Sequence, residues 1–85
     1  MKSKYQNIKS SKGHFSGTRD GNTFSAQFDL FLIKEAWNRG LDLEDEADGY
    51  GPGEGIHGDW SGIRDSSEDA RNKMLEKSLN FIFTD

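Results

Sequence analysis

A glycine-rich, acidic segment in the middle of the chain limits what the rest can fold into. Residues 41–62 hold six of the ten glycines and the only proline of this 85-residue protein. Because glycine loses more conformational freedom on folding than any other residue, this density disfavours helix interiors and ordinary strands alike. We therefore expect a long acidic, glycine-rich loop over 41–62. A loop of this length in a small domain is usually functional or disordered.

The apolar residues favour one small domain with a core built on aromatic rings. Hydrophobic residues make up 32% of the chain, Val and Cys are absent, and ten residues are Phe, Trp or Tyr. Each buried ring removes about 150–250 Å² from water, so a few rings replace many aliphatic side chains. Without Cys there is no disulfide, thiolate metal site or thiol nucleophile, which fits a reducing cytoplasm.

The first residues predict an arm or strand followed by a hairpin. Residues 1–12 are polar and basic, and they form either a basic arm or an edge strand. Residues 13–28 are expected to form a β-hairpin, because Asp20 and Gly21 favour a type I′ turn. Along the returning arm, apolar and polar residues alternate over 24–28, as in a half-buried strand.

The apolar spacing changes after Asp29, which is placed to cap a helix over about 30–39. Gly40 follows directly and suits a helix end. The alternative for this stretch is one continuous helix over 24–39. The order of elements here, strand then helix or a single helix, stays open at this point.

After the loop, the sequence predicts a second helix over about 67–79. Ser66 and Asp69 fit a capping pattern, and the apolar residues that follow recur at helical spacing. A short β-prone run at about 80–84 is expected to add a strand to the sheet. The predicted fold class is therefore α+β, with a small antiparallel sheet and two helices.

The charge changes sign halfway along the chain. Residues 1–40 carry seven basic and three acidic residues, a net charge of +4, whereas residues 41–85 carry four basic and twelve acidic residues, a net charge of −8. Two surfaces of opposite sign attract different partners. Each half is therefore considered as a separate binding surface.

The basic half favours contact with single-stranded RNA. Its cations are interleaved with aromatic rings, and this combination can follow phosphates while rings stack on unpaired bases. The simpler alternative is that these lysines keep the arm soluble. The residues predicted to bind RNA are Lys2, Lys4, Tyr5, Lys9, Lys12 and Arg19.

The acidic half favours contact with a basic protein surface. A carboxylate-rich loop can occupy the groove in which a nucleic-acid-handling enzyme holds its substrate. Trp60 is equally well placed as an interface anchor or as a core residue. The residues predicted to bind protein are Asp42, Glu44, Asp45, Glu46, Asp48, Tyr50, Asp59 and Trp60.

The motif search gives little support for catalysis, metal binding or nucleotide binding. His14 and His57 are the only histidines, and no serine lies in a nucleophile-elbow pattern. Residues 44–49 resemble the start of a calcium-binding loop, but the position that needs a glutamate is Gly55. We therefore expect a protein that is not an enzyme and that holds no cofactor or metal.

Taken together, these traits resemble the small, acidic, cysteine-free proteins with which bacteriophages disarm host enzymes. Anti-CRISPR proteins and inhibitors of toxin endoribonucleases belong to this group. The resemblance covers the whole chain at the level of size, charge and low aliphatic content. It implies a counter-defence inhibitor that binds a nucleic-acid-handling host protein in the bacterial cytoplasm, with RNA as a possible part of the complex.

Two other functions remain as alternatives. One is a stand-alone RNA-binding module that uses the basic N-terminal arm. The other is a homodimeric regulatory subunit, in which the run over 80–84 pairs edge to edge with its copy. No apolar stretch is long enough to predict a membrane span.

Overall fold

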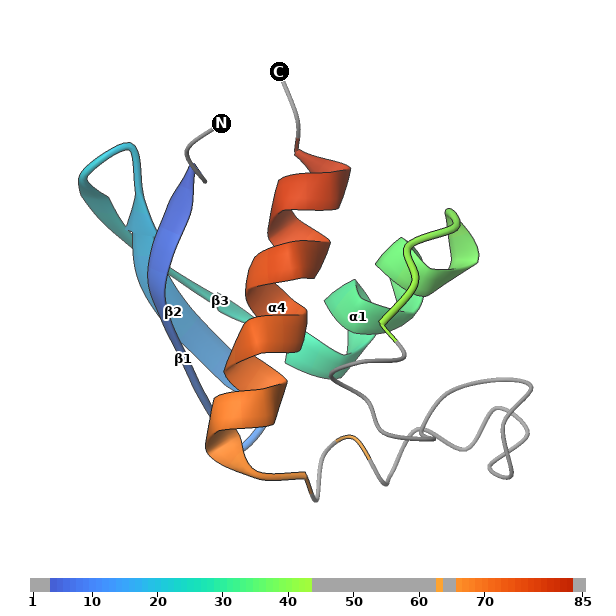
Figure 1. The fold of residues 1–85 in the computed structure, drawn as a ribbon. Helices are drawn as coiled ribbons and strands as arrows, with labels where there is room; N and C mark the ends of the chain where they lie inside the picture. The colour runs from blue at the N-terminus through green and yellow to red at the C-terminus, as the bar shows by residue number, and fades with distance from the viewer. Residues whose placement is uncertain (1–3, 44–62, 64–65, 84–85) are drawn as a thin grey trace.

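The computed structural model describes residues 4–43, 63 and 66–83, which form a three-stranded antiparallel sheet and two helices (Figure 1). The elements are β1 (Tyr5–Ser11), β2 (His14–Arg19), β3 (Asn22–Gln27), α1 (Asp29–Asn38) and α4 (Glu68–Ile82). The central strand is β2. Helix α4 packs on β1, and α1 packs on α4. The predicted α+β class is confirmed.

Two tight turns set the register of the sheet. Asp20 and Gly21 both have positive φ, 52° and 86°, which is the type I′ geometry that joins β2 to β3. Lys12 and Gly13, at 52° and 77°, join β1 to β2 in the same way. The hairpin predicted over 13–28 is confirmed. The alternative of one helix over 24–39 is wrong, because its first residues pair with β2.

Strand β1 lies at one edge of the sheet, so the edge-strand alternative for residues 1–12 is correct for 5–11. A bulge interrupts its pairing between Gln6 and Lys9, and Asn7 there has a φ of 56°. Opposite the bulge, a Cβ on Gly17 would lie 2.9 Å from the carbonyl oxygen of Gln6. Glycine therefore lets β1 approach β2 closely at this point.

Helix α1 begins one residue earlier than predicted, and Asp29 does not cap it. Phe28 occupies the N-cap position without a side-chain hydrogen bond. Asp29 lies in the first turn, where its Oδ1 accepts a hydrogen bond from the Leu30 amide at 2.7 Å. Past the C-terminal end, Gly40 has a φ of 112°, as the sequence predicted for a glycine that ends a helix.

Helix α4 is longer than the helix predicted over 67–79. Ser67, rather than Ser66, caps it, because the Ser67 hydroxyl accepts a hydrogen bond from the Ala70 amide at 3.1 Å. The strand predicted over 80–84 is wrong where the structure describes it, since α4 continues to Ile82. Helical spacing carries the apolar stripe on to this residue. The third strand is β1 instead.

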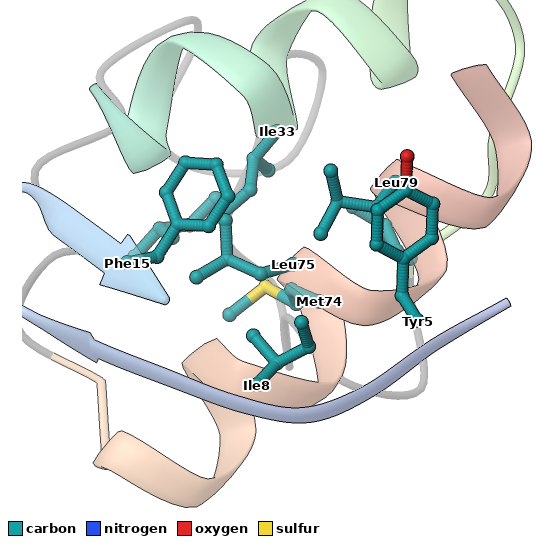
Figure 2. Close-up of a cluster of buried hydrophobic side chains, with 9 residues drawn as sticks. Tyr5, Ile8, Phe15, Ile33, Met74, Leu75 and Leu79 are labelled. Atoms are coloured by element: carbon teal, nitrogen blue, oxygen red, sulfur yellow. The ribbon is translucent and has the colours of Figure 1, made fainter. Parts of the chain in front are cut away.

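The core lies between the sheet and the two helices. Figure 2 shows side chains from β1, β2, α1 and α4 that converge around Met74 and Leu75, both fully buried. Leu43 and Ile63 extend the cluster from outside these elements. Burying one aliphatic side chain of this size contributes about 1.5–3 kcal/mol, so a few such residues carry much of the stability of a small domain.

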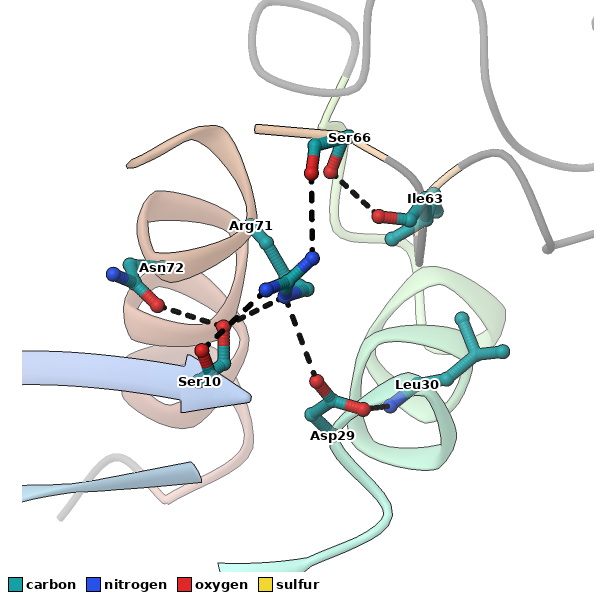
Figure 3. A network of polar contacts seen from close by, with 7 residues as sticks. All are labelled: Ser10, Asp29, Leu30, Ile63, Ser66, Arg71 and Asn72. Carbon is teal, nitrogen blue, oxygen red and sulfur yellow. Dashed lines mark hydrogen bonds and ion pairs between the residues drawn. The ribbon is translucent and has the colours of Figure 1, made fainter. Parts of the chain in front are cut away.

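A partly buried guanidinium joins the elements around this core (Figure 3). The Arg71 side chain of α4 is only 14% exposed, and its Nε donates a hydrogen bond to the Ser10 hydroxyl of β1 at 2.7 Å. The Ser10 hydroxyl donates in turn to Asn72 Oδ1 at 2.8 Å. Arg71 also donates to the Ser66 carbonyl at 3.3 Å and lies 3.8 Å from the buried Asp29 carboxylate of α1. One side chain thus ties both helices to the edge of the sheet.

We expect Arg71→Met to lower the free energy of unfolding by about 3–5 kcal/mol, because it leaves the Asp29 carboxylate buried beside an apolar group. The double variant Arg71→Met/Asp29→Asn should recover part of that loss. Urea titration followed by circular dichroism measures both. The matched control is Lys73→Met, because Lys73 forms an exposed ion pair with Asp69. This control should change stability by less than about 0.5 kcal/mol; equal losses in both single variants would contradict the account.

Candidate functional site

A groove lined by aromatic rings lies where the helices leave β3 uncovered. Because α4 packs on β1 and α1 packs on α4, β3 contributes only half-buried side chains on its helix-facing side. The hollow there has a volume of about 340 Å³. We call it the aromatic groove. Its lining includes Phe15, Phe24, Phe28, Phe31, Leu79 and Phe83.

The floor of the aromatic groove is a set of rings in contact. Phe24 lies edge to face against Tyr5, with centroids 5.6 Å apart, and against Phe15, with centroids 6.1 Å apart. The ring centroid of Phe83, at the end of α4, lies 6.3 Å from that of Tyr5. Such edge-to-face pairs contribute about 0.5–1.5 kcal/mol beyond the area they bury. The floor is therefore held in place by the core beneath it.

Two rings on the wall of the groove are open to solvent instead. Phe28 and Phe31 are 70% and 69% exposed. Phe28 also has a φ of 65°, in the left-handed region that a bulky residue rarely adopts. The Phe28 backbone joins β3 to α1, since its amide donates to the Gly13 carbonyl at 2.6 Å and its carbonyl accepts from the Leu32 amide at 3.2 Å. Its ring, by contrast, lies mostly in water, and backbone strain of this kind is concentrated at functional sites.

Two lysines lie at the end of the groove beside these two rings. A second hollow of about 630 Å³ adjoins it and shares Phe28 and Phe31, and we call it the basic end. Lys12, His14 and Lys34 line it, and all three are exposed. Its one acidic residue is Asp29, which is buried and paired with Arg71. The basic end therefore offers positive charge directly beside two exposed rings.

The structure does not gather the predicted RNA-binding residues into one patch. Lys12 lies at the turn between β1 and β2, and Lys9 lies on β1. Lys4 and Arg19 lie at the opposite end of the sheet, where the Asp20 amide donates to the Lys4 carbonyl. Of these four, only Lys12 belongs to the basic end. Lys2 lies outside the described residues.

The prediction that Tyr5 stacks on RNA needs correction. Its side chain is 3% exposed and belongs to the core. The Arg19 guanidinium lies over the same ring, 5.7 Å from its centroid. Alternation along β1 directs Tyr5 to the same side of the sheet as Ile8 beyond the bulge, so its ring is used for packing.

Most of the predicted protein-binding residues lie outside the described part of the chain: Glu44, Asp45, Glu46, Asp48, Tyr50, Asp59 and Trp60. Asp42 is described and exposed, directly before the buried Leu43. The acidic loop predicted over 41–62 is likewise described only as far as residue 43. Asp42 is therefore the one predicted protein-binding residue that the structure describes.

Phe28, Phe31 and Lys34 are not among the site residues predicted from the sequence. The alternation over 24–28 includes Phe28 as part of a half-buried strand, and Phe31 only flanks the apolar stripe of the predicted helix. Phe28 is the one residue between β3 and α1, and this position, which the structure alone gives, leaves its ring exposed.

Within 4–43, 63 and 66–83, no group of three His, Asp or Glu side chains is arranged to hold a metal ion. In the same residues, no helix has the length and apolar character that a membrane crossing requires. The aromatic groove and its basic end are therefore the features of the described surface on which a functional argument can rest.

If Phe28 is kept for binding rather than for folding, Phe28→Gly should not destabilise the protein. Relief of left-handed strain contributes about 1–2 kcal/mol, and the extra flexibility of glycine costs about 0.5–1 kcal/mol. The free energy of unfolding, measured in urea, should therefore be unchanged or higher by up to about 1.5 kcal/mol. Phe15→Ala, which removes a buried ring, is the contrasting control and should lower it by about 3–5 kcal/mol. A loss above about 1 kcal/mol for Phe28→Gly would show that the ring serves packing.

Comparisons with known proteins assign this chain to no family. It matches no protein-family model, no curated protein and no solved structure. Its function has to be argued from the chemistry of the aromatic groove and the basic end.

Proposed function

We propose that this chain is a non-enzymatic binding protein that docks on a partner protein through the aromatic groove. The observation that carries the proposal is the exposure of Phe28 and Phe31, about 70% each, at the wall of a hollow with an aromatic floor. Exposed apolar patches with polar rims are typical of protein interaction sites. Aromatic residues are also enriched where interfaces concentrate their binding energy.

The groove has the arrangement that a strong contact needs. Its floor is fixed by edge-to-face ring contacts, so a partner side chain meets a surface that is already in place. Pre-formed sites lose less conformational entropy on binding. The exposed wall supplies apolar area that is in water before docking and out of water after it.

The class of partner follows from the charge of the second half of the chain. We propose an inhibitor role against a nucleic-acid-handling enzyme, in which the net charge of −8 over residues 41–85 favours a basic partner surface. The acidic residues that carry this part of the proposal lie almost entirely outside the described residues. The aromatic groove adds a second contact that the charge pattern alone does not predict.

A second candidate function is RNA binding at the basic end. Lys12 and Lys34 lie beside Phe28 and Phe31, and cations next to exposed rings are what single-stranded RNA requires. This candidate uses Lys12 from the predicted set and replaces the buried Tyr5 with the two exposed rings. It differs from the first candidate in needing no protein partner.

Affinity capture from bacterial lysate tests the first candidate, with wild-type protein and Phe31→Ser as baits. Phe31→Ser removes an exposed ring and should leave the fold intact. We expect wild-type bait to retain a specific protein and Phe31→Ser to retain at least about tenfold less, which corresponds to the loss of about 1.4 kcal/mol. Capture should be unaffected by treating the lysate with ribonuclease.

The matched control is Phe81→Ser, because Phe81 is a partly exposed ring, 38% accessible, that lines neither hollow. It should capture as the wild type does. Equal capture by all three baits would show that the partner protein does not dock at the aromatic groove. Capture that ribonuclease abolishes would favour the RNA candidate instead.

A further inference from the structure

Strand β3 is an edge strand without the features that usually protect one. It pairs with β2 on one side, and no other described strand pairs with it. Its sequence, Asn-Thr-Phe-Ser-Ala-Gln, contains no charged residue and no proline, and its register shows no bulge. The opposite edge, β1, carries both Lys9 and a bulge. Charges and bulges are the devices that deter strand pairing, so β3 is the open edge of this sheet.

The turn before β3 determines which of its backbone groups are available. A two-residue type I′ turn makes its flanking residues, Arg19 and Asn22, the first hydrogen-bonded pair. Antiparallel pairs then alternate, so Phe24 and Ala26 direct their N–H and C=O groups toward β2. The intervening residues Thr23, Ser25 and Gln27 direct theirs away from the sheet. An added strand would find three evenly spaced residues with which to pair.

The aromatic groove lies on the helix-facing side of this same edge. Phe24 and Ala26 of β3 line it, together with Phe28 and Phe31 of the following helix start. Because alternate side chains of a strand point to the same face, every second residue of an added strand would lie over the groove. Apolar residues at those positions would continue the aromatic floor. The other positions would face solvent beside the polar side of the sheet.

Positive charge lies at both ends of the edge. Arg19 lines the aromatic groove near the start of β3, and Lys12, His14 and Lys34 line the basic end near Gln27. The carboxylate of Asp29 faces Arg71 and not the groove. A second copy of this chain, paired antiparallel along β3, would bring Arg19 of one copy toward the basic end of the other. That repulsion disfavours self-pairing and favours an acidic occupant.

From these observations we propose that the occupant of this site is an extended peptide segment of a partner protein that adds to β3 as a fourth strand. The segment has apolar residues at alternate positions, which fill the aromatic groove, and acidic residues at the end that meets Lys12 and Lys34. Main-chain hydrogen bonds to Thr23, Ser25 and Gln27 hold it, and the side chains select it. This inference rests on the proposed function, since it specifies what docks in the same groove.

A fluorescein-labelled peptide of alternating valine and threonine that ends in three glutamates is a direct probe. Fluorescence anisotropy with the whole protein should show saturable binding that weakens as salt is raised. A peptide that ends in three lysines should bind at least about tenfold more weakly, a difference of about 1.4 kcal/mol. Absence of saturable binding at the solubility limit of the glutamate peptide overturns the proposal.

N-methylation of the probe tests strand addition without altering the protein. In a bound peptide, every second N–H points toward β3 and the others point away from it. A peptide methylated on the nitrogens that point toward β3 loses these hydrogen bonds, whereas one methylated on the other nitrogens keeps them. We expect one methylated peptide to lose binding and the other to retain it. Equal behaviour of the two peptides would rule out pairing along a strand edge.

On the protein, Ser25→Pro removes an outward N–H while leaving the pairing of β3 with β2 intact. It should weaken probe binding at least about tenfold, and Ser25→Ala, which keeps the N–H, is the matched control and should bind as the wild type does. Circular dichroism confirms that each variant is folded.

Displacement of the probe by oligouridylate at lower concentration than by unlabelled peptide would assign the groove to RNA and remove the peptide proposal.

The two proposals can fail separately. If capture of the partner protein from lysate depends on Phe31 but is unchanged by Ser25→Pro, the result supports docking at the aromatic groove and contradicts strand addition. If capture is unchanged by Phe31→Ser, the proposed function falls, whatever the synthetic peptide does.

Discussion

The arrangement of this small protein depends on the partly buried guanidinium of Arg71. It contacts β1 through Ser10, α1 through Asp29 and the chain before α4 through Ser66. Removing one partner of a buried ion pair leaves the other charge uncompensated and costs about 3–5 kcal/mol, so the observed placement of the helices keeps the buried Asp29 carboxylate paired. In that placement α4 packs on β1 and α1 packs on α4. The aromatic groove lies along β3, at the other edge of the sheet from β1.

This placement explains how a chain with few apolar residues forms a core and still leaves rings in water. Met74, Leu75 and Ile33 are fully buried where the layers meet. Phe28 and Phe31 stay outside, although burying an aromatic side chain contributes about 1.5–3 kcal/mol. A thin core that leaves this stabilisation unused, and accepts left-handed strain at Phe28, is consistent with rings retained for a partner. The groove, the open edge and the cations around them then form one surface with a shared use.

Much of the fold could be predicted from the sequence, because the signals were local. The Asp20-Gly21 turn and the glycine after α1 depend on backbone geometry that few other residues accept. The end of α4 was mispredicted because Phe81 and Ile82 are β-prone, whereas tertiary packing extends the helix through them. The site was mostly missed for a related reason. Whether Phe28 and Phe31 are buried depends on where α1 packs, and α1 packs on α4 through long-range contacts such as the one between Asp29 and Arg71, 42 residues apart in sequence.

Amide hydrogen exchange of the free protein, followed residue by residue by NMR, tests the central claim that β3 presents an open edge. The account predicts an alternating pattern along one strand. The amides of Phe24 and Ala26, which face β2, should be protected, and those of Thr23, Ser25 and Gln27 should exchange at rates close to those of an unstructured peptide. Uniform protection along β3 would mean that the edge is already occupied in the free protein, and it would contradict the account.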